Sequence, residues 1–280
     1  MSTGRQKALR PRMGEVVIIG GFLLLLPLYA FAWEQAYTRE APGRPLHVVG
    51  SDCTQYTLEQ SCSQDVGSAE CRAAVDAGVQ VWNSTGCSYF HFVPTATATC
   101  CRVGFQREGK NANCISWLDD VWPDSYPPTA IALTTITYNV ADGAILDADV
   151  ELNGAAFSFG TTCAAGLADI QNTVAHETGH MLGLDHTSVA GATMRPRSYP
   201  GDCELRDLAT DDIDGVCTIY PLSGSPGVCK EPQGGVNLDC SPPPDDCGCR
   251  APGDSPSGSA ASLAVLALLL LRLRRRRSPS

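Results

Sequence analysis

Basic residues are scarce in the body of this 280-residue chain. Residues 33–271 contain 11 Lys and Arg but 29 Asp and Glu, a formal net charge of −18, because the other basic residues lie near the two ends. An acidic body repels nucleic acid and anionic lipid, so a nucleic-acid-binding protein is excluded. The acidity suits solubility outside a cell, but it does not identify a substrate.

Long apolar runs are also absent, and a short one lies near the N-terminus. Four basic side chains precede an apolar run over 16–30, which ends in the small-x-small motif Ala30-Phe31-Ala32. This order is typical of a secretory signal peptide over residues 1–32 that is cleaved after Ala32. An uncleaved anchor is the alternative, but the run is shorter than the roughly 20 residues that a membrane span needs. We therefore expect an exported protein.

A second short apolar run, over 259–271, lies between Cys247-Gly248-Cys249 and five arginines. A helix of this length rises only about 20 Å, so a permanent solitary anchor is marginal. The arrangement resembles the C-terminal sorting tag of myxobacterial surface proteins. The resemblance implies recognition and processing by sorting machinery near Cys249, with at least transient membrane contact and a final place on the cell surface, in the outer membrane or in the medium. A simple tail anchor is the alternative.

Paired C-x-x-C motifs at zinc-ribbon spacing are missing, although the chain has 14 cysteines. Cys100-Cys101 and Cys247-x-Cys249 are poor spacings for a tetrahedral metal site. In an exported chain, so many cysteines favour disulfides formed in an oxidising compartment. Metal clusters are the competing use, and the sequence leaves the connectivity open.

Composition divides the chain into four parts and predicts one α+β domain. The signal peptide (1–32) is followed by a globular domain (33–222) that is long enough to bury a core. A Pro-, Gly- and Cys-rich linker (223–256) and the apolar helix with its arginine cluster (257–280) complete the chain.

Hydrophobic periodicity predicts helices over 70–82 and 167–182 and strands over 131–138 and 144–152. Thr210 is expected to be the N-cap of a last helix, with Asp211 and Asp212 favoured in its first turn by the helix dipole.

Three of the five histidines lie within the eleven residues from His176 to His186. On a helix, His176 and His180 are one turn apart on the same face and can share one ion. Gly183 can end the helix in the left-handed conformation, and the reversal can bring His186 back as a third ligand. Three protein nitrogens leave a fourth position for water, which predicts one catalytic zinc.

Glu177 is adjacent to a ligand but cannot itself be one in this geometry. Its carboxylate is free to take a proton from a water that zinc makes more acidic, and to pass it to a departing amine. The pattern therefore predicts hydrolysis of peptide bonds without a covalent intermediate. One alternative is a core helix with incidental histidines. Another is a catalytically silent, zinc-stabilised surface binding or adhesion protein, against which Glu177 speaks, because stability would need only the histidines.

The segment His-Glu-x-x-His-x-x-Gly-x-x-His over 176–186 resembles that of the metzincin zinc endopeptidases. Met194, and Asp211-Asp212 near the start of the last helix, resemble the matrixin branch. The resemblance implies an α+β catalytic domain with a twisted mixed sheet, a long active-site helix and a C-terminal subdomain with a methionine turn and a final helix. It also implies that Met194 is a floor rather than a ligand and that Asp211 and Asp212 are structural supports.

The resemblance further implies a protein or peptide substrate that pairs with an edge strand, for which residues 147–153 are the candidate. Arg195 departs from the family pattern, because a tyrosine usually follows the methionine of the turn. Only His47 and His91 precede the helix, so a second zinc is not predicted. Calcium is possible at a cluster of acidic residues, although a solvated strand face is the favoured explanation. The cluster comprises Asp142, Asp147, Asp149 and Glu151.

Overall fold

The computed structural model describes residues 33–238, apart from 96–97, 99–100 and 102. The predicted signal peptide, the second half of the predicted linker and the predicted sorting tag lie outside the described residues. Within the described part of the chain, no helix is both long and apolar enough to cross a membrane.

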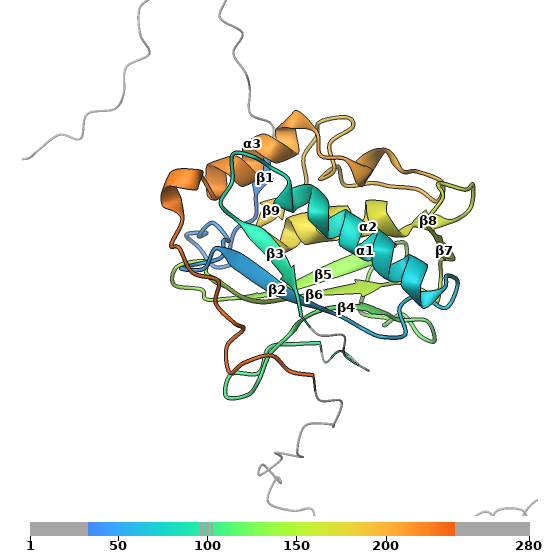
Figure 1. Cartoon of the computed structure of the whole chain (residues 1–280), viewed down its shortest axis with the longest axis horizontal. Coiled ribbons are helices and arrows are strands. Elements are labelled where there is room, and N and C mark those ends of the chain that lie inside the picture. The colour runs from blue at the N-terminus through green and yellow to red at the C-terminus, as the bar shows by residue number, and fades with distance from the viewer. Residues whose placement is uncertain (1–32, 96–97, 99–100, 102, 239–280) are drawn as a thin grey trace, which may run out of the picture. The chain divides into compact units, whose positions relative to one another are not determined.

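A five-stranded mixed sheet carries the domain (Figure 1). β3, β2, β4 and β6 run parallel to one another, whereas β5 runs antiparallel to β6 and forms one edge of the sheet. The strands, in spatial order, are β3 (His91–Pro94), β2 (Cys53–Leu58), β4 (Asn113–Trp117), β6 (Ile145–Leu152) and β5 (Ala132–Tyr138). The two predicted strands are confirmed, each starting one residue later than expected.

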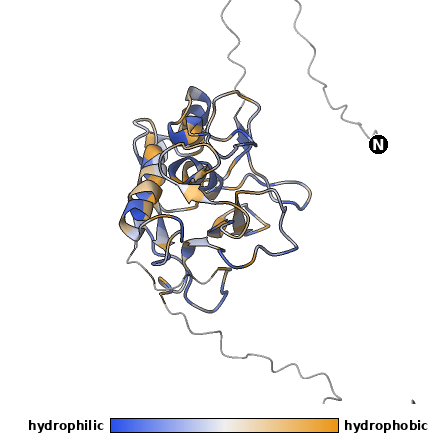
Figure 2. Ribbon diagram, turned by 90° about the vertical axis from the view of Figure 1, so that its right-hand side faces the viewer, coloured by the Kyte–Doolittle hydropathy of each residue, from blue (hydrophilic) through white to orange (hydrophobic). Residues whose placement is uncertain are grey.

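Helices α1 (Ser68–Asn83) and α2 (Ile170–Met181) lie on the same side of the sheet, and α3 (Thr210–Ile219) follows near the end of the domain (Figure 1). Gly78 lets α1 and α2 approach closely, because a Cβ there would lie 2.7 Å from the carbonyl oxygen of Gln171. The Trp82 indole N–H of α1 donates to the Ala175 carbonyl of α2 at 2.9 Å. Both colours of the hydropathy scale occur along the helices in Figure 2, as expected for elements with one buried face. The predicted α+β fold is confirmed.

Helix α2 begins later than its periodicity predicts. Leu167 was expected within the helix, but Ala168–Asp169 form the short strand β8, which pairs in parallel with β7 (Phe159–Gly160). The Asp169 side chain then accepts the Asn172 backbone N–H at 2.9 Å. This carboxylate satisfies a backbone donor that the helix cannot, so Asp169 is the N-cap and the helix starts at Ile170.

Among the described residues, five disulfides join cysteines that lie between 9 and 176 residues apart in the chain. The prediction of disulfide bonds is thereby confirmed. The pairs are Cys53–Cys229, Cys62–Cys71, Cys87–Cys217, Cys101–Cys114 and Cys163–Cys203.

The first part of the predicted linker packs on the domain. Cys229 is joined to Cys53 of β2, and the Lys230 backbone N–H donates to Ser51 Oγ at 2.9 Å. Farther along, the carbonyl of Gln233 accepts from Asn111 Nδ2 at 2.7 Å. The Pro- and Gly-rich composition predicts an extended spacer, but it does not reveal the partners that hold this segment up to residue 238.

The acidic residues of β6 do not form a solvated face, so that expectation is wrong. Asp149 is fully buried, and its two carboxylate oxygens accept the backbone N–H groups of Gly104 at 2.7 Å and Cys114 at 2.9 Å. Glu151 accepts the Tyr126 hydroxyl at 2.8 Å. The segments that precede and follow β4 in the chain thus cover these side chains. In the described residues these carboxylates do not form a group of three or more ligand atoms that meet at one point, so the structure gives no support for a calcium ion here.

Asp147 is expected to make the fold less stable as the pH rises. Burial, and then the neighbouring Asp149 carboxylate, raise the pKa of Asp147. The folded state therefore keeps a proton that the unfolded chain releases above about pH 4, so stability present in acid is lost from there upward. Asp147→Asn should reduce the fall in unfolding free energy between pH 5 and pH 8 by about 1 kcal/mol or more, measured by urea denaturation.

The matched control is Asp142→Asn, which changes an exposed carboxylate in the turn before β6. Its pH profile should parallel that of the wild type. If the Asp147→Asn profile were parallel as well, the buried carboxyl pair would not be the source of the pH dependence.

Candidate metal centre

The end of α2 turns the chain back toward its own face. Leu182 closes the helix, and Gly183 follows with φ +87°, a conformation that costs glycine little. A Cβ at Gly183 would lie 2.2 Å from the Leu46 carbonyl oxygen. Leu184–Asp185 then form β9, which pairs with β1 (Glu34–Gln35). The reversal leaves His186 next to the exposed face of α2.

The three histidines meet at one point. His186 Nε2 lies 3.2 Å from His176 Nε2 and 3.2 Å from His180 Nε2. Zinc bonds of about 2.0–2.1 Å in a tetrahedral arrangement place two nitrogens roughly 3.3 Å apart, so the spacing fits one zinc. The sequence expectation brought together these same three residues.

Backbone carbonyls fix the orientation of two of the rings. The Thr193 carbonyl lies 2.7 Å from His176 Nδ1, and the Leu184 carbonyl lies 2.9 Å from His180 Nδ1. Because a carbonyl only accepts, each Nδ1 carries the proton and each Nε2 keeps its lone pair for a metal. Burial lowers the pKa of His176 to about 4 and that of His180 to about 4, so both rings are neutral at pH 7.

A second group of possible ligands does not compete with this one. His91 lies close to the sulfur atoms of Cys53 and Cys229. Those sulfurs are joined in a disulfide, so they are not available as thiolate ligands. In the described residues, the histidine cluster on α2 is therefore the better candidate metal centre.

Glu177 lies beside the cluster without belonging to it. Its side chain is 7% exposed, and its Oε2 accepts the Thr134 hydroxyl of β5 at 2.6 Å. Thr134 therefore fixes the carboxylate between α2 and the last strand of the sheet. Thr134 was not predicted as a site residue, because nothing in a strand pattern tells which residue will face a helix from another part of the chain.

Met194 packs under α2 as the floor of the site. A Cβ at Gly179 would lie 2.2 Å from Met194 Sδ, so the glycine between the two helical histidines makes room for the thioether. The turn that carries Met194 is held by Asp212, whose oxygens accept the backbone N–H groups of Thr193 at 2.7 Å and Met194 at 3.0 Å.

The start of α3 differs from its prediction in one residue. Ala209, not Thr210, is the N-cap, because Asp212 Oδ2 reaches back to the Ala209 backbone N–H at 2.8 Å. One carboxylate thus closes the helix end and supports the methionine turn. Asp211 does not accept these backbone N–H groups, and its Oδ2 is buried without a hydrogen-bond partner among the described residues.

Asp212→Ala is expected to lower the unfolding free energy by about 3 kcal/mol or more, because three backbone donors lose a buried charged acceptor. The same variant should weaken zinc binding, since the Thr193 carbonyl orients His176. Asp211→Ala is the matched control and should cost clearly less. Chemical denaturation and a zinc titration of both variants measure the difference, and equal losses would contradict the role of Asp212.

A cleft of about 980 Å³ passes over the histidines and Glu177. Strand β5 and the preceding residues form one side, and residues 195–200 form the other. The expected substrate strand, residues 147–153, corresponds to β6 and lies inside the sheet between β4 and β5. That expectation is wrong, because β5 is the strand at the end of the sheet beside α2.

Arg195, at the position of the expected tyrosine, bonds within its own loop. Its guanidinium lies 3.0 Å from Asp202 Oδ2 and 3.3 Å from Glu204 Oε2. Asn172 and Asp169, which lie four and seven residues before His176, were not predicted as site residues. Their spacing places Asn172 one turn before His176 on α2 and Asp169 at the N-cap of the same helix, and this signal could have identified them.

Comparisons with known proteins agree with this geometry. Interstitial collagenase of Oryctolagus cuniculus is 42% identical over 66 residues, which cover 23% of this chain and 14% of the collagenase. Neutrophil collagenase of Homo sapiens is 48% identical over 52 residues, 19% of this chain and 11% of the relative. Metalloendoproteinase 5-MMP of Arabidopsis thaliana is 43% identical over 54 residues, 19% of this chain and 15% of the relative.

Each aligned stretch therefore spans less than a fifth of these relatives. The matrixin family model, in contrast, matches residues 51–221, which include the whole sheet, the histidine cluster and α3. Because this match covers more than half of the sequence, the chain belongs to the matrixin family.

Proposed function

We propose that this matrixin is a zinc-dependent metalloendopeptidase that hydrolyses peptide bonds outside the cytoplasm. The observation that carries the proposal is the meeting of three imidazole nitrogens beside a buried carboxylate in an open cleft. Family membership supports a metalloprotease. Zinc bound by His176, His180 and His186 would supply the positive charge that polarises a peptide carbonyl and makes a water molecule more acidic.

Glu177 is the proposed general base. Its carboxylate takes the proton of the attacking water, and the same group then gives a proton to the departing amine. The Thr134 hydroxyl holds one carboxylate oxygen at 2.6 Å and leaves the other for this task. The carbonyls of Thr193 and Leu184 keep the proton of each helical imidazole away from the reacting atoms.

The substrate is proposed to be a protein or peptide in extended form. Strand β5 ends the sheet on the side of α2, so an extended chain could add to it as a further strand. The backbone would supply much of the binding, and side chains would be selected by the pockets of the cleft.

An oxidising compartment is part of the proposal. The five disulfides support it, because such bonds persist outside the reducing cytoplasm. The N-terminal signal pattern agrees with export. The C-terminal pattern supports contact with a sorting machinery and a membrane, at the cell surface or before release.

A silent zinc-stabilised binding protein is the less favoured alternative. It would need the histidines but would have no use for a buried carboxylate positioned by Thr134. The two functions differ in turnover rather than in metal content.

The test is cleavage of casein and of a diverse peptide library by the purified protein with its disulfides formed. We expect chelator-sensitive cleavage inside the peptides, identified by mass spectrometry of the products. A folded protein that binds zinc but cuts neither substrate would favour the binding protein instead.

A further inference from the structure

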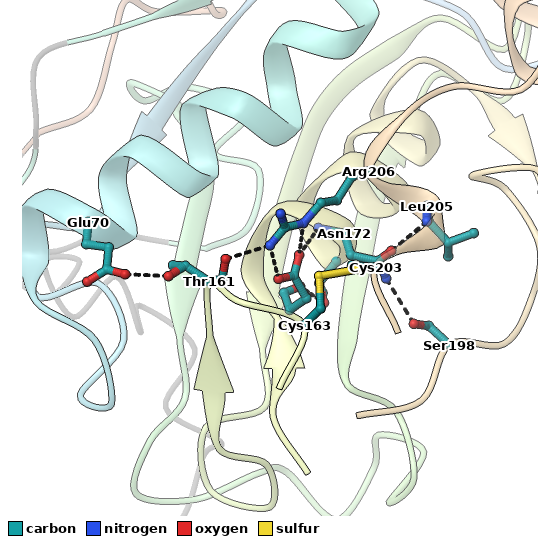
Figure 3. Close-up of polar contacts among 10 residues, drawn as sticks. Glu70, Thr161, Cys163, Asn172, Ser198, Cys203, Leu205 and Arg206 are labelled. Atoms are coloured by element: carbon teal, nitrogen blue, oxygen red, sulfur yellow. Dashed lines mark hydrogen bonds and ion pairs between the residues drawn. A yellow bond between two sulfur atoms is a disulfide. The ribbon is translucent and has the colours of Figure 1, made fainter. Parts of the chain in front are cut away.

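The loop that follows Met194 forms one side of the cleft and is fastened at several points. We call residues 195–206 the cleft wall; its first six residues line the cleft opposite β5. Figure 3 shows the contacts that tie the far part of this loop to α2 and to the segment before it.

Asn172 fastens the cleft wall to the helix that carries the histidines. It is 1% exposed and lies one turn before His176. Its Oδ1 accepts the Leu205 backbone N–H at 2.7 Å, and its Nδ2 donates to Ser198 Oγ at 2.9 Å (Figure 3). One buried amide thus holds two points of the wall, and Asn172 and Ser198 both line the cleft.

A disulfide fastens the same loop covalently. Cys203 is joined to Cys163, 40 residues earlier, in the segment between β7 and β8. Beside it, the Gly201 backbone N–H donates to the Leu167 carbonyl at 2.7 Å. The wall is therefore fixed to a second element as well as to α2.

An ion pair fastens the end of the wall. The Arg206 guanidinium contacts both oxygens of Asp169, with Nε 2.9 Å from Oδ1. It also donates to the Thr161 carbonyl (Figure 3). The Asp169 side chain is fully buried and is the N-cap of α2. A bidentate pair of this kind fixes direction as well as distance. Thr161 in turn donates to Glu70 of α1.

We propose that these fastenings make the cleft wall a fixed specificity element. Cys163–Cys203, Asn172 and Arg206 act as positioning residues for the part of the cleft that residues 195–200 line together with the histidine cluster. A mobile wall would widen or narrow to suit side chains of different size. A fixed wall keeps its shape. A substrate side chain that is too large then clashes with it, and one that is too small leaves a void, so kcat/KM falls in both cases. This inference rests on the proposed peptidase function.

The experiment compares peptides that differ only in the residue after the scissile bond, with Ala, Leu or Phe there. The ratios of kcat/KM are measured for the wild type, for Cys163→Ser with Cys203→Ser, and for Cys62→Ser with Cys71→Ser. The last pair removes a disulfide at the start of α1 that does not line the cleft. Arg206→Lys adds a conservative variant that keeps the charge but not the bidentate geometry.

The wild type should prefer its best residue by more than tenfold. Loss of the Cys163–Cys203 disulfide should reduce the ratio of kcat/KM between the best and the worst peptide at least fivefold, while the zinc content stays unchanged. Arg206→Lys should reduce this ratio less, and the Cys62 and Cys71 control should leave it unchanged. An active Cys163 and Cys203 variant with the preference of the wild type would overturn the inference.

Hydrogen exchange on the wild type decides the matter if the variant does not fold. The Gly201 and Leu205 amides should be protected to the same degree as those of α2, and exchange as fast as in an open loop would refute a fixed wall. A wild type that cuts none of the peptides counts against the proposed function alone, because hydrogen exchange still tests the wall.

Discussion

Replacing Glu177 with Gln should lower kcat/KM on casein-derived peptides by a factor on the order of 10² to 10⁴ while one zinc stays bound. Glutamine keeps the size of the side chain and can still accept the Thr134 hydroxyl, so the local packing is preserved. It cannot take a proton from water at neutral pH. Steady-state kinetics and metal analysis on the same samples separate loss of the base from loss of the metal.

Glu151→Gln is the matched control for this variant. Glu151 is as buried as Glu177, with 6% exposure, but it bonds Tyr126 and does not line the cleft. Its kcat/KM should stay within a few-fold of the wild type. A Glu177→Gln enzyme that kept more than a tenth of the wild-type rate would refute the assignment of the base.

His186→Ala is expected to weaken zinc binding by well over 100-fold and to abolish cleavage. The residue contributes one of three nitrogens, whereas loss of an outer hydrogen-bond partner alone costs about 10- to 100-fold in metal affinity. A competition titration with a chromogenic chelator measures the affinity. His186 lies outside the helix and is exposed, so its removal should disturb the core little.

His47→Ala serves as the control, because His47 bonds the carbonyl of Pro45 and lies outside the cluster. It should bind zinc as the wild type does. If His186→Ala kept wild-type zinc affinity, the third ligand would have to be another group. The proposal that the chain reversal at Gly183 brings a zinc ligand to α2 would then be contradicted.

The sequence predicted the local elements of this fold well where their periodicity was strong. β-Branched residues identified β5 and alternation identified β6, each with its start within one residue, and three- and four-residue steps identified α1. The histidine spacing predicted that a helix and a glycine turn would bring three rings together. These features depend on residues that are near each other in the chain.

Long-range contacts were not predictable in the same way. The alternation of β6 is the same whether water or a loop covers its acidic face, so the burial of Asp147 and Asp149 was missed. The disulfide Cys53–Cys229 spans 176 residues, and spacing alone cannot choose among many possible pairings. The strand expected to pair with the substrate was wrong for a similar reason, since the sequence of one strand does not determine the order of strands in the sheet.

The start of α2 shows how one side chain can override periodicity. Leu167 fits the apolar pattern of the helix, yet Asp169 accepts the Asn172 backbone N–H in the first turn and ends the preceding strand β8. The same residue binds Arg206 of the cleft wall. A helix boundary, a cap and a site-supporting ion pair therefore share one carboxylate, which a pattern of apolar residues cannot reveal.

The most direct test of the account is a titration of zinc into the metal-free protein while casein cleavage is followed. The account predicts no cleavage without metal, a linear rise in rate, and a plateau at one zinc per chain. Cleavage by the metal-free protein, or a protein that takes up one zinc at the histidine cluster and still cuts nothing, would contradict it.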